Sequence, residues 1–494
     1  MQTHKILFAA SEAHPLMKTG GLADVAGSLP VALKSLRQDV RLIIPAYRDV
    51  LARAGKLTLV NPVLAGFAEP VRILEGKLPG STLKVWLVDA PAWFDRPGNP
   101  YLGPDGKDWP DNAQRFALFA RAVAAVARNQ AGLDWQPDVV HCNDWQCGLI
   151  PALLAQDATR PATVFTIHNL AYQGLFPLAP LKVENTFKDL NLPPELWSPE
   201  GLEFYGGLSF IKGGLVYADM LSTVSPNYAR EILTPEYGCG LEGLLSHRAD
   251  RLVGILNGVD YHEWDPQRDT LIAQPYSARN LSGKAANKAA LQARVGLPVV
   301  PEIPVIGLIG RLVEQKGVDL VLASLPEVLQ QPVQVVMLGG GEKRFEAAFT
   351  ELMVHHPQQL AVQIGFNEGL AHLIESGADM FVMPSRFEPC GLNQIYSLRY
   401  GTVPIVRRTG GLSDTVVDAT SDNLASGSAT GVVFDKATAP ALLEAIQHTL
   451  TLYRQPSIWQ QIIRTGMLQD FSWRRSAKYY LELYEQAIAL RLSA

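Results

Sequence analysis

Short apolar runs of strand length recur along the chain, and longer stretches with apolar residues at helical spacing separate them. Strands that alternate with helices predict βαβ units, in which helices cover both faces of a parallel sheet. The first series of runs is Ile6–Ala10, Val40–Ile44, Val85–Val88, Val139–His141, Thr163–Ile167, Met220–Val224 and Val253–Leu256. The second series is Val305–Ile309, Val333–Leu338, Val362–Ile364, Met380–Met383, Val403–Val406 and Val432–Phe434. The pattern predicts an α/β fold with two doubly wound, Rossmann-like domains facing a cleft.

A polar segment that contains proline separates the two series and begins at Asn257-Gly258-Val259-Asp260. Such a segment is typical of a hinge and linker. We expect one domain over residues 1–256 and a second over residues 257–475. The remaining residues, 476–494, place Tyr480, Leu483, Tyr484 and Ile488 on one helical face. Periodicity alone does not choose whether this helix closes the second domain or crosses back to the first.

Composition limits the kinds of partner. The 494 residues are 47% hydrophobic and 18% charged, with a net charge of −5 and no long run of one sign. A basic surface for nucleic acid or an anionic membrane is therefore not expected, and any anionic ligand must be met by a local site. The four cysteines lack paired metal-ligand spacing, and no apolar run approaches the ~18 residues of a membrane span. We expect a cytoplasmic protein without a metal site.

A glycine-bearing loop, Lys18-Thr19-Gly20-Gly21-Leu22-Ala23-Asp24-Val25, follows the first predicted strand. Paired glycines let backbone N–H groups approach an anion closely, and the helix that follows contributes its positive N-terminal end. Lys18 adds a mobile positive charge that suits phosphate. The loop indicates either an anion site or a tight turn with a solvated lysine.

Charged loops also follow three predicted strands of the second half. Open α/β sheets bind ligands at strand ends, so Arg311 and Lys316 could clamp a diphosphate and neutralise a leaving group. Glu388 could accept hydrogen bonds from sugar hydroxyls, and the predicted helix Asn393–Tyr400 could point its N-terminus at phosphate. The third loop is Arg407-Arg408-Thr409-Gly410-Gly411-Leu412. Ordinary turns with surface ion pairs remain the alternative.

Polar and aromatic residues follow two neighbouring strands of the first half: His141, Asp144 and Trp145 after one, and His168-Asn169 after the next. Hydrogen-bonding groups beside an aromatic ring suit a carbohydrate. The sequence contains no Gly-x-Ser-x-Gly, His-Glu-x-x-His or Asp-x-Asp motif, which argues against a serine hydrolase, a zinc protease and a metal-dependent sugar transferase.

In these segments the sequence resembles the family of bacterial glycogen synthases and plant starch synthases, which are retaining glucosyltransferases with the two-domain GT-B fold. The resemblance covers almost the whole chain. It rests on the Lys18–Val25 loop, His141 with Asp144-Trp145, Thr166-Ile167-His168-Asn169, Asn257-Gly258-Val259-Asp260, Gly310-Arg311 with Lys316-Gly317, Ser385-Arg386-Phe387-Glu388-Pro389-Cys390-Gly391-Leu392, and Arg408-Thr409-Gly410-Gly411-Leu412.

The resemblance implies transfer of glucose from ADP-glucose to the non-reducing end of an α-1,4-glucan, such as glycogen or starch, with retention of configuration. It implies an acceptor-side N-terminal domain, a nucleotide-sugar-binding C-terminal domain, and a terminal helix that crosses back to the first domain. It implies no metal or pyridoxal phosphate cofactor. The physics of the residues does not by itself distinguish ADP-glucose from UDP-glucose, because both share the diphosphate and the sugar.

The resemblance also implies roles for residues. The implied catalytic residues are His168, Arg311, Lys316 and Glu388; the implied donor-binding residues are Lys18, Gly20, Gly21, Asp24, Asn169, Asn257, Phe366, Cys390, Gly391, Leu392, Thr409 and Gly410; and the acceptor side is assigned to Asp144 and Trp145.

Four positions depart from the patterns of related sugar transferases. Tyr396 stands where a Glu-x7-Glu pattern would place its second glutamate, which agrees with the glycogen synthase group. Phe366 stands where a tyrosine commonly stacks on the nucleobase, so that stacking is kept and a phenolic hydrogen bond is lost. Phe94 replaces a tyrosine, and Gln146 replaces a frequent histidine.

Two other functions remain open from the residues alone. A glucan phosphorylase of similar shape would carry a lysine-bound pyridoxal phosphate. A glucan-binding protein without catalysis would not need Lys18, His168, Arg311, Lys316 and Glu388 together.

Overall fold

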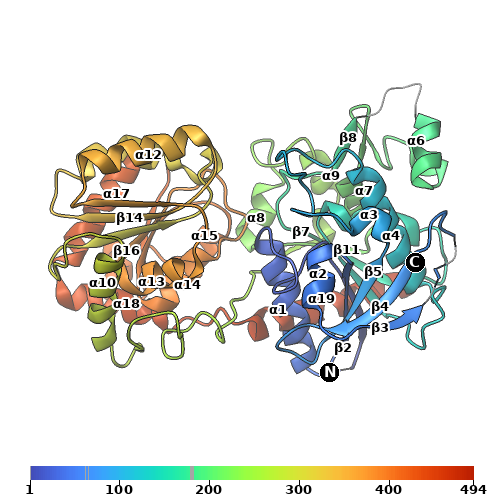
Figure 1. The fold of residues 1–494 in the computed structure, drawn as a ribbon, viewed down its shortest axis with the longest axis horizontal. Coiled ribbons are helices and arrows are strands. Elements are labelled where there is room, and N and C mark those ends of the chain that lie inside the picture. The colour runs from blue at the N-terminus through green and yellow to red at the C-terminus, as the bar shows by residue number, and fades with distance from the viewer. Residues whose placement is uncertain (1, 62, 65, 178–182, 494) are drawn as a thin grey trace. The chain divides into compact units, whose positions relative to one another are not determined.

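The structure is a computed structural model that describes residues 2–61, 63–64, 66–177 and 183–493 (Figure 1). The chain forms two compact units, each with its own sheet. Unit 1 consists of Met1–Val224, Ala229–Gly258 and Trp473–Ala494, and unit 2 consists of Ser225–Tyr228 and Val259–Ser472. The chain therefore passes from unit 1 into unit 2 after Gly258 and returns after Ser472.

Unit 1 is built on a nine-stranded sheet with the strand order β12-β11-β7-β6-β1-β2-β5-β4-β3. The seven strands predicted from apolar runs all form and pair in parallel, which agrees with the expected fold class. They are β1 (Lys5–Ala9), β2 (Asp39–Pro45), β5 (Lys84–Asp89), β6 (Val139–Asn143), β7 (Ala162–Ile167), β11 (Met220–Thr223) and β12 (Leu252–Gly254).

The sequence pattern missed the antiparallel parts of unit 1. β3 (Thr58–Asn61) and β4 (Arg72–Lys77) form an antiparallel edge beside β5. A separate antiparallel sheet joins β8 (Leu175–Pro177), β9 (Glu203–Phe204) and β10 (Gly207–Ser209) in the order β8-β10-β9. These strands are short or partly solvent-facing, with Leu59 51% exposed, so they lack the continuous apolar run that marks a strand buried on both faces.

Helices pack around the sheet of unit 1. They are α1 (Gly21–Ser35), α2 (Arg48–Arg53), α3 (Pro91–Phe94), α4 (Asn112–Ala127), α5 (Leu149–Leu154), α6 (Val183–Leu190), α7 (Phe210–Tyr217), α9 (Glu242–His247) and α19 (Trp473–Ser493), with α8 (Pro226–Glu231) at the boundary of the two units.

The terminal helix α19 belongs to unit 1, so the predicted return of the chain to the first domain is confirmed. It packs on α1 and on the adjacent strands β6, β7 and β11. Tyr480 and Tyr484 on its apolar face are fully buried. The Tyr484 hydroxyl lies 2.8 Å from Nδ1 of His141 in β6, and the Ser476 hydroxyl donates to the Leu256 carbonyl at 2.7 Å.

Unit 2 is built on a six-stranded parallel sheet with the order β15-β14-β13-β16-β17-β18. Numbered from its first strand, this is the 3-2-1-4-5-6 order of the dinucleotide-binding fold. The strands are β13 (Val305–Ile309), β14 (Gln334–Gly339), β15 (Leu360–Ile364), β16 (Met380–Met383), β17 (Val403–Arg407) and β18 (Val432–Phe434). The direction of strand order reverses between β13 and β16, and such a switch point is where open α/β sheets bind ligands.

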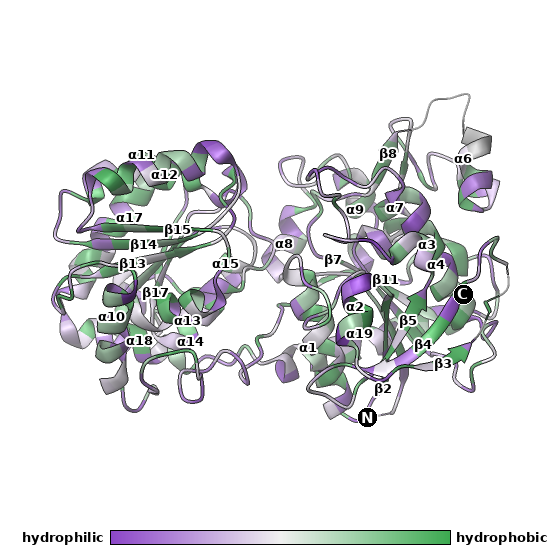
Figure 2. Cartoon of the chain, viewed as in Figure 1, coloured by the Kyte–Doolittle hydropathy of each residue, from purple (hydrophilic) through white to green (hydrophobic). Residues whose placement is uncertain are grey.

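Helices cover both faces of this sheet (Figure 1). They are α10 (Ser282–Arg294), α11 (Val318–Val328), α12 (Lys343–His355), α13 (Glu368–Gly377), α14 (Asn393–Tyr400), α15 (Gly410–Thr415), α16 (Ser421–Ser426), α17 (Ala439–Tyr453) and α18 (Pro456–Met467). Figure 2 shows the strands as largely hydrophobic and the helices as hydrophobic on one side, which is the pattern of a sheet buried between two helical layers.

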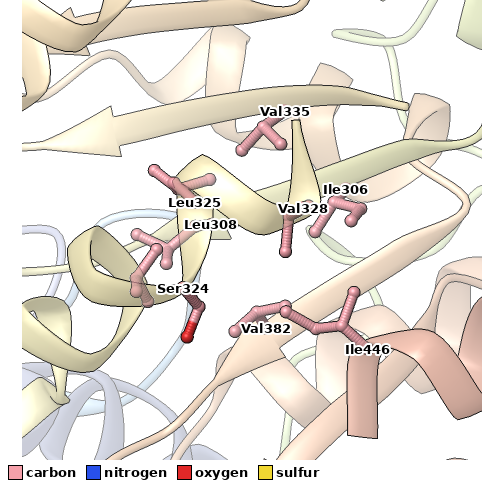
Figure 3. Close-up of a pocket in the computed structure, with 9 residues that line it drawn as sticks. Ile306, Leu308, Ser324, Leu325, Val328, Val335, Val382 and Ile446 are labelled. Atoms are coloured by element: carbon pink, nitrogen blue, oxygen red, sulfur yellow. The ribbon is translucent and has the colours of Figure 1, made fainter. Parts of the chain in front are cut away.

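The core of unit 2 contains a small cavity between β13, β14, β16, α11 and α17 (Figure 3). Its lining is aliphatic except for Ser324, whose hydroxyl donates to the Leu320 carbonyl at 2.8 Å. Because its single hydroxyl is already engaged, this cavity offers no polar group to a phosphate or a sugar.

In the part of the chain that the structure describes, no helix has the length and apolar character needed to cross a bilayer.

Candidate functional site

In unit 1, the predicted glycine loop lies at the carboxyl end of β1 and leads into α1. Lys18 Nζ lies 2.6 Å from Asp24 Oδ1, so the predicted cation and carboxylate pair within this loop. Gly20 is the N-cap of α1 in an extended conformation, without a side-chain cap. A Cβ atom added at Gly20 or Gly21 would meet nothing within 4 Å. The start of α1 therefore presents backbone N–H groups beside open space.

Glu12 is a buried acid behind this loop that the sequence reasoning missed. It is 3% exposed, and its Oε2 accepts a hydrogen bond from the Thr19 backbone N–H at 2.5 Å. Burial raises its pKa to about 7, and the charge of Asp24 acts in the same direction. Next to it, the Ser11 and Tyr101 hydroxyls lie 2.8 Å apart. The available signal was an acid directly after a buried strand and before a glycine loop.

Asp144 follows β6, the strand next to β1, and supports the loop after β7. Its Oδ1 accepts a hydrogen bond from the His168 backbone N–H at 3.0 Å, and its own N–H donates to the Thr166 carbonyl at 2.9 Å. Its φ of 59° and ψ of 178° lie in a region that non-glycine residues rarely occupy, and such strain concentrates at functional sites. Burial raises its pKa to about 7. Asp144 thus holds the His168 loop; a role toward an acceptor stays a prediction.

The two histidines of unit 1 are buried and differ in their partners. His168 Nε2 lies 2.9 Å from Asn143 Oδ1, which accepts from it because the Asn143 amide nitrogen donates to the Ala9 carbonyl. His141 contacts Thr166 Oγ1 at 2.6 Å and Tyr484. Burial lowers the pKa of each imidazole to about 3. Both rings are therefore neutral at pH 7, and His141 is a structural link to α19.

The other predicted residues of unit 1 lie on segments next to this site or just before the chain passes into unit 2. Asn169 follows His168, and its Oδ1 accepts from the Ala171 N–H at 3.1 Å. Trp145 packs edge-on against Phe116 at 5.1 Å between ring centroids, which makes it part of an aromatic cluster. Asn257 is 6% exposed and directly precedes the crossing into unit 2.

In unit 2, the predicted cation and carboxylate form a partly buried ion pair at the switch point. Lys316 follows β13, Glu388 follows β16, and Lys316 Nζ lies 2.5 Å from Glu388 Oε2. The Ser385 hydroxyl donates to the same carboxylate oxygen at 3.0 Å. Glu388 is 6% exposed, and Lys316 is more open. The pair places one mobile cation beside one fixed carboxylate.

Arg311 is exposed at the end of β13, and its guanidinium donates to Gln315 Oε1 at 3.3 Å. Arg386, in the loop after β16, makes a bidentate ion pair with Asp319, with N–O distances of 2.6 and 2.7 Å. That pair fixes the loop that carries Glu388 onto the start of α11. Arg311 and Lys316 thus supply positive charge at the edge where the fold binds ligands.

The glycines after β16 and β17 bring these loops into contact. Gly410 has a φ of 42°, and a Cβ atom there would lie 1.9 Å from the Glu388 carbonyl oxygen. At Gly411 it would lie 2.1 Å from the Cys390 carbonyl oxygen. The Gln394 amide donates to the Cys390 carbonyl at 2.9 Å. Only glycine lets the start of α15 pack on the loop of Glu388.

The remaining predicted residues of unit 2 surround this edge. Cys390 and Thr409 are buried, Gly391 has a φ of 73°, and Leu392 is the N-cap of α14. Phe366 lies beyond β15, directly after Gly365 with a φ of 101°, and is 85% exposed. An aromatic ring so exposed at the ligand edge is available for stacking.

The structure therefore brings the predicted residues together in two groups. Unit 1 groups Lys18, Gly20, Gly21, Asp24, Asp144, His168 and Asn169, with Trp145 and Asn257 on neighbouring segments; unit 2 groups Arg311, Lys316, Glu388, Cys390, Gly391, Leu392, Thr409 and Gly410, with Phe366 just beyond β15.

Two family models match the chain. The model described as "Starch synthase catalytic domain" matches residues 5–247, and the model described as "Glycosyl transferases group 1" matches residues 294–465. The first falls within unit 1 apart from residues 225–228, and the second falls within unit 2.

The chain is similar to curated bacterial proteins over its whole length. It is 57% identical over 488 residues to the glycogen synthase of Thioalkalivibrio sulfidiphilus, covering 98% of this chain and 100% of the relative. It is 56% identical over 485 residues to glycogen synthase 1 of Methylococcus capsulatus, covering 98% and 97%. The solved catalytic domain of starch synthase IV from Arabidopsis thaliana, bound to ADP and acarbose, is 30% identical with a TM-score of 0.86 and covers 99% of this chain and 100% of that one.

Proposed function

We infer that this chain, which belongs to the family of bacterial glycogen synthases and plant starch synthases, transfers glucose from ADP-glucose to the non-reducing end of an α-1,4-glucan. It is a glucosyltransferase that retains the α configuration of the donor. The observation that carries the assignment of chemistry is the cation pair Arg311 and Lys316 at the switch point of the six-stranded sheet, with Glu388 bonded to Lys316.

The donor reaction needs positive charge at the diphosphate. The bond between glucose C1 and the β-phosphate oxygen breaks, its electron pair leaves with ADP, and positive charge develops on the sugar. Arg311 and Lys316 stabilise the departing diphosphate, which they do best at the transition state because that is when the charge develops. The N-terminus of α14 and the amides of Cys390, Gly391 and Leu392 add dipoles of the same sign.

Glu388 supplies a fixed acceptor for glucose hydroxyls. Its Oε2 accepts hydrogen bonds from Lys316 and Ser385, so the carboxylate is oriented before a sugar arrives. Phe366 would stack on the nucleobase with its exposed ring. The starch synthase relative was solved with ADP, which supports adenosine diphosphate as the nucleotide of the donor.

Unit 1 would contact the sugar through groups that are either uncharged or held in an ion pair. The open N–H groups at Gly20 and Gly21, with Lys18, would meet the phosphate and glucose region. The loop of His168 and Asn169 would line the glucose, and its backbone would face the anomeric carbon. His168 is neutral and donates Nε2–H to Asn143, so it positions this loop and does not act as a general acid.

Retention is explained by attack on the face from which ADP departs. The acceptor 4-hydroxyl oxygen forms the new bond to C1, and its proton passes to the leaving phosphate oxygen. In this scheme no side chain becomes covalently bound. Mass spectrometry of the enzyme quenched with donor in turnover should show an unmodified chain; a glucosyl adduct on any side chain would instead establish a double-displacement route.

The function is tested with purified protein, a glycogen primer and either ADP-glucose or UDP-glucose. ADP-glucose should give ADP release matched by new α-1,4-linked glucose, with a smaller rate for UDP-glucose. Anomeric configuration is read by NMR of the extended glucan. Absence of nucleotide release with both donors, or formation of glucose 1-phosphate from glycogen and inorganic phosphate, would overturn the assignment.

A further inference from the structure

Three potential metal ligands that do not belong to the Lys316–Glu388 pair converge in unit 2. Glu263, Glu368 and His372 each offer one ligand atom, and these atoms all lie within 4.8 Å of one another. Glu368 is the first residue of α13 and His372 lies four residues on, so the two side chains share one face of the helix. Glu263 comes from the segment just after the crossing into unit 2, in a turn where the Trp264 N–H donates to the Asp260 carbonyl at 2.9 Å.

The orientation of His372 is fixed by two neighbours. Its Nδ1 lies 2.7 Å from Asp269 Oδ2, and the ring stacks on Trp264 with centroids 3.8 Å apart at 15°. Because a carboxylate only accepts, Nδ1 carries the hydrogen and Nε2 carries the lone pair. The Tyr400 hydroxyl donates to the same Asp269 oxygen at 2.5 Å. A carboxylate behind an imidazole is the arrangement that orients metal-binding histidines.

The second ring nitrogen of His372, Nε2, is buried near the two glutamates. His372 is 1% exposed, and within the described residues Nε2 has no hydrogen-bond partner. A buried imidazole nitrogen without a partner is costly. A cation held by the three atoms would supply that partner. One imidazole nitrogen and two carboxylate oxygens form a donor set that suits Zn²⁺, which binds such ligands at about 2.0–2.2 Å.

We propose that Glu263, Glu368 and His372 bind one divalent transition-metal ion, with Zn²⁺ the preferred occupant. The ion joins the first segment of unit 2 to the start of α13. It takes no part in glucosyl transfer, so the site is independent of the function inferred above. Its effect is on the stability of unit 2, since a ligand that binds only the folded chain shifts the folding equilibrium.

The test uses the full chain, freed of metal by dialysis against a chelator and titrated with Zn²⁺ by calorimetry. The wild type should bind one equivalent at this site and show a higher Tm with Zn²⁺. Glu368→Gln removes an exposed ligand without disturbing the core, and it should weaken binding by about tenfold or more and abolish the Tm shift. Glu351→Gln is the matched control, because Glu351 also lies four residues before a histidine, His355, on the exposed face of α12. It should bind as the wild type does.

Cobalt provides a second, spectroscopic readout. Co²⁺ added to the metal-free wild type should give visible d–d absorption bands that are lost in His372→Gln and in Glu368→Gln. Failure of the wild type to bind Zn²⁺ or Co²⁺, or equal binding by the wild type and Glu368→Gln, would overturn the proposal.

Discussion

Two glycine pairs begin helices at strand ends in the two units, and they serve opposite purposes. Gly20-Gly21 opens α1 in unit 1, and a Cβ atom there would meet open space. Gly410-Gly411 opens α15 in unit 2, and a Cβ atom there would collide with the Glu388 and Cys390 carbonyls. One pair leaves open space against the backbone, and the other lets two loops of the protein touch. The same sequence feature therefore needs its structural surroundings before it can be interpreted.

The polar groups of the two units differ in a related way. Near Gly20, Glu12 and Asp144 are buried acids with pKa values raised by burial to about 7, and His168 is kept neutral. Near Gly410, Lys316 and Glu388 form an ion pair. Apart from the Lys18–Asp24 ion pair on the loop itself, unit 1 thus offers polarity with little fixed charge, which suits sugar hydroxyls, and unit 2 offers charge, which suits a diphosphate.

Removal of the unit 2 cation should have the largest effect. In Lys316→Met, kcat should fall by about 10²–10³, because the leaving ADP loses a charge partner and Glu388 is left unpaired. Release of ADP at saturating substrates is the measurement. Lys343→Met is the control, since Lys343 forms a 2.6 Å ion pair with Glu346 on the surface of α12, and its rate should match the wild type. Equal losses in both variants would refute a specific role for Lys316.

The close-packed glycine gives the next largest effect. Gly410→Ala should destabilise unit 2 by about 2–4 kcal/mol, since its Cβ would clash with the Glu388 carbonyl at a positive φ. Differential scanning calorimetry should show a lower transition temperature. Gly369→Ala in α13 is the matched control, because its only near neighbour is 3.8 Å away, and alanine there favours the helix. An unchanged transition in Gly410→Ala would mean that the two loops do not depend on this contact.

The buried acid of unit 1 should appear in the pH dependence of stability. Glu12 has a pKa of about 7 in the folded chain against an ordinary value of 4.5, so the folded state holds more protons between these values. Its contribution to stability therefore falls as pH rises from about 4.5 to 7, by about 2–3 kcal/mol in all. Glu12→Gln has no carboxyl group at this position and therefore lacks this pH-dependent contribution to stability. Urea unfolding of both proteins across this range should show the wild type losing stability relative to Glu12→Gln, and parallel curves would refute the raised pKa.

The open glycine should give the smallest effect, and only on function. Gly20→Ala should leave the Tm unchanged, since its backbone is extended and its Cβ would meet no atom. The KM for ADP-glucose should rise about tenfold, equivalent to about 1.4 kcal/mol, because the methyl group occupies the space kept for the donor. Gly243→Ala in α9 also meets no atom and should change neither quantity. A lower Tm with an unchanged KM in Gly20→Ala would show that this glycine is needed for packing, as Gly410 is, and would refute the contrast between the two pairs.

The parallel cores were predictable because each strand there is buried on both faces. β13 was expected at Val305–Ile309 and lies there, since its apolar run is continuous. β4 was missed because Arg72, Glu75 and Lys77 interrupt its pattern while its backbone pairs with β5. A strand of this kind is identified by its partner, which the linear sequence does not contain.

The candidate site was predictable where chemistry and position coincide, as in Lys316 and Glu388 at two strand ends. It was less predictable where a residue acts through burial. The raised pKa of Glu12 comes from its burial in the folded chain. The Asp144 carboxylate accepts a hydrogen bond from the His168 backbone N–H. The grouping of Glu263 with His372 likewise depends on a turn that brings two distant segments together.

The position of α19 has a consequence for the order in which the protein is made. The last strand of the unit 1 sheet ends at Gly254. The helix α19, whose Tyr484 hydroxyl contacts His141 in that sheet, begins only at Trp473. All of Val259–Ser472 is synthesised in between. At about 5–20 residues per second this takes roughly 10–40 seconds, during which the first sheet lacks a helix that buries part of it. Unit 2 can therefore complete its core first, although it is encoded second, and the nascent first unit is the part exposed to chaperones and proteases while it waits.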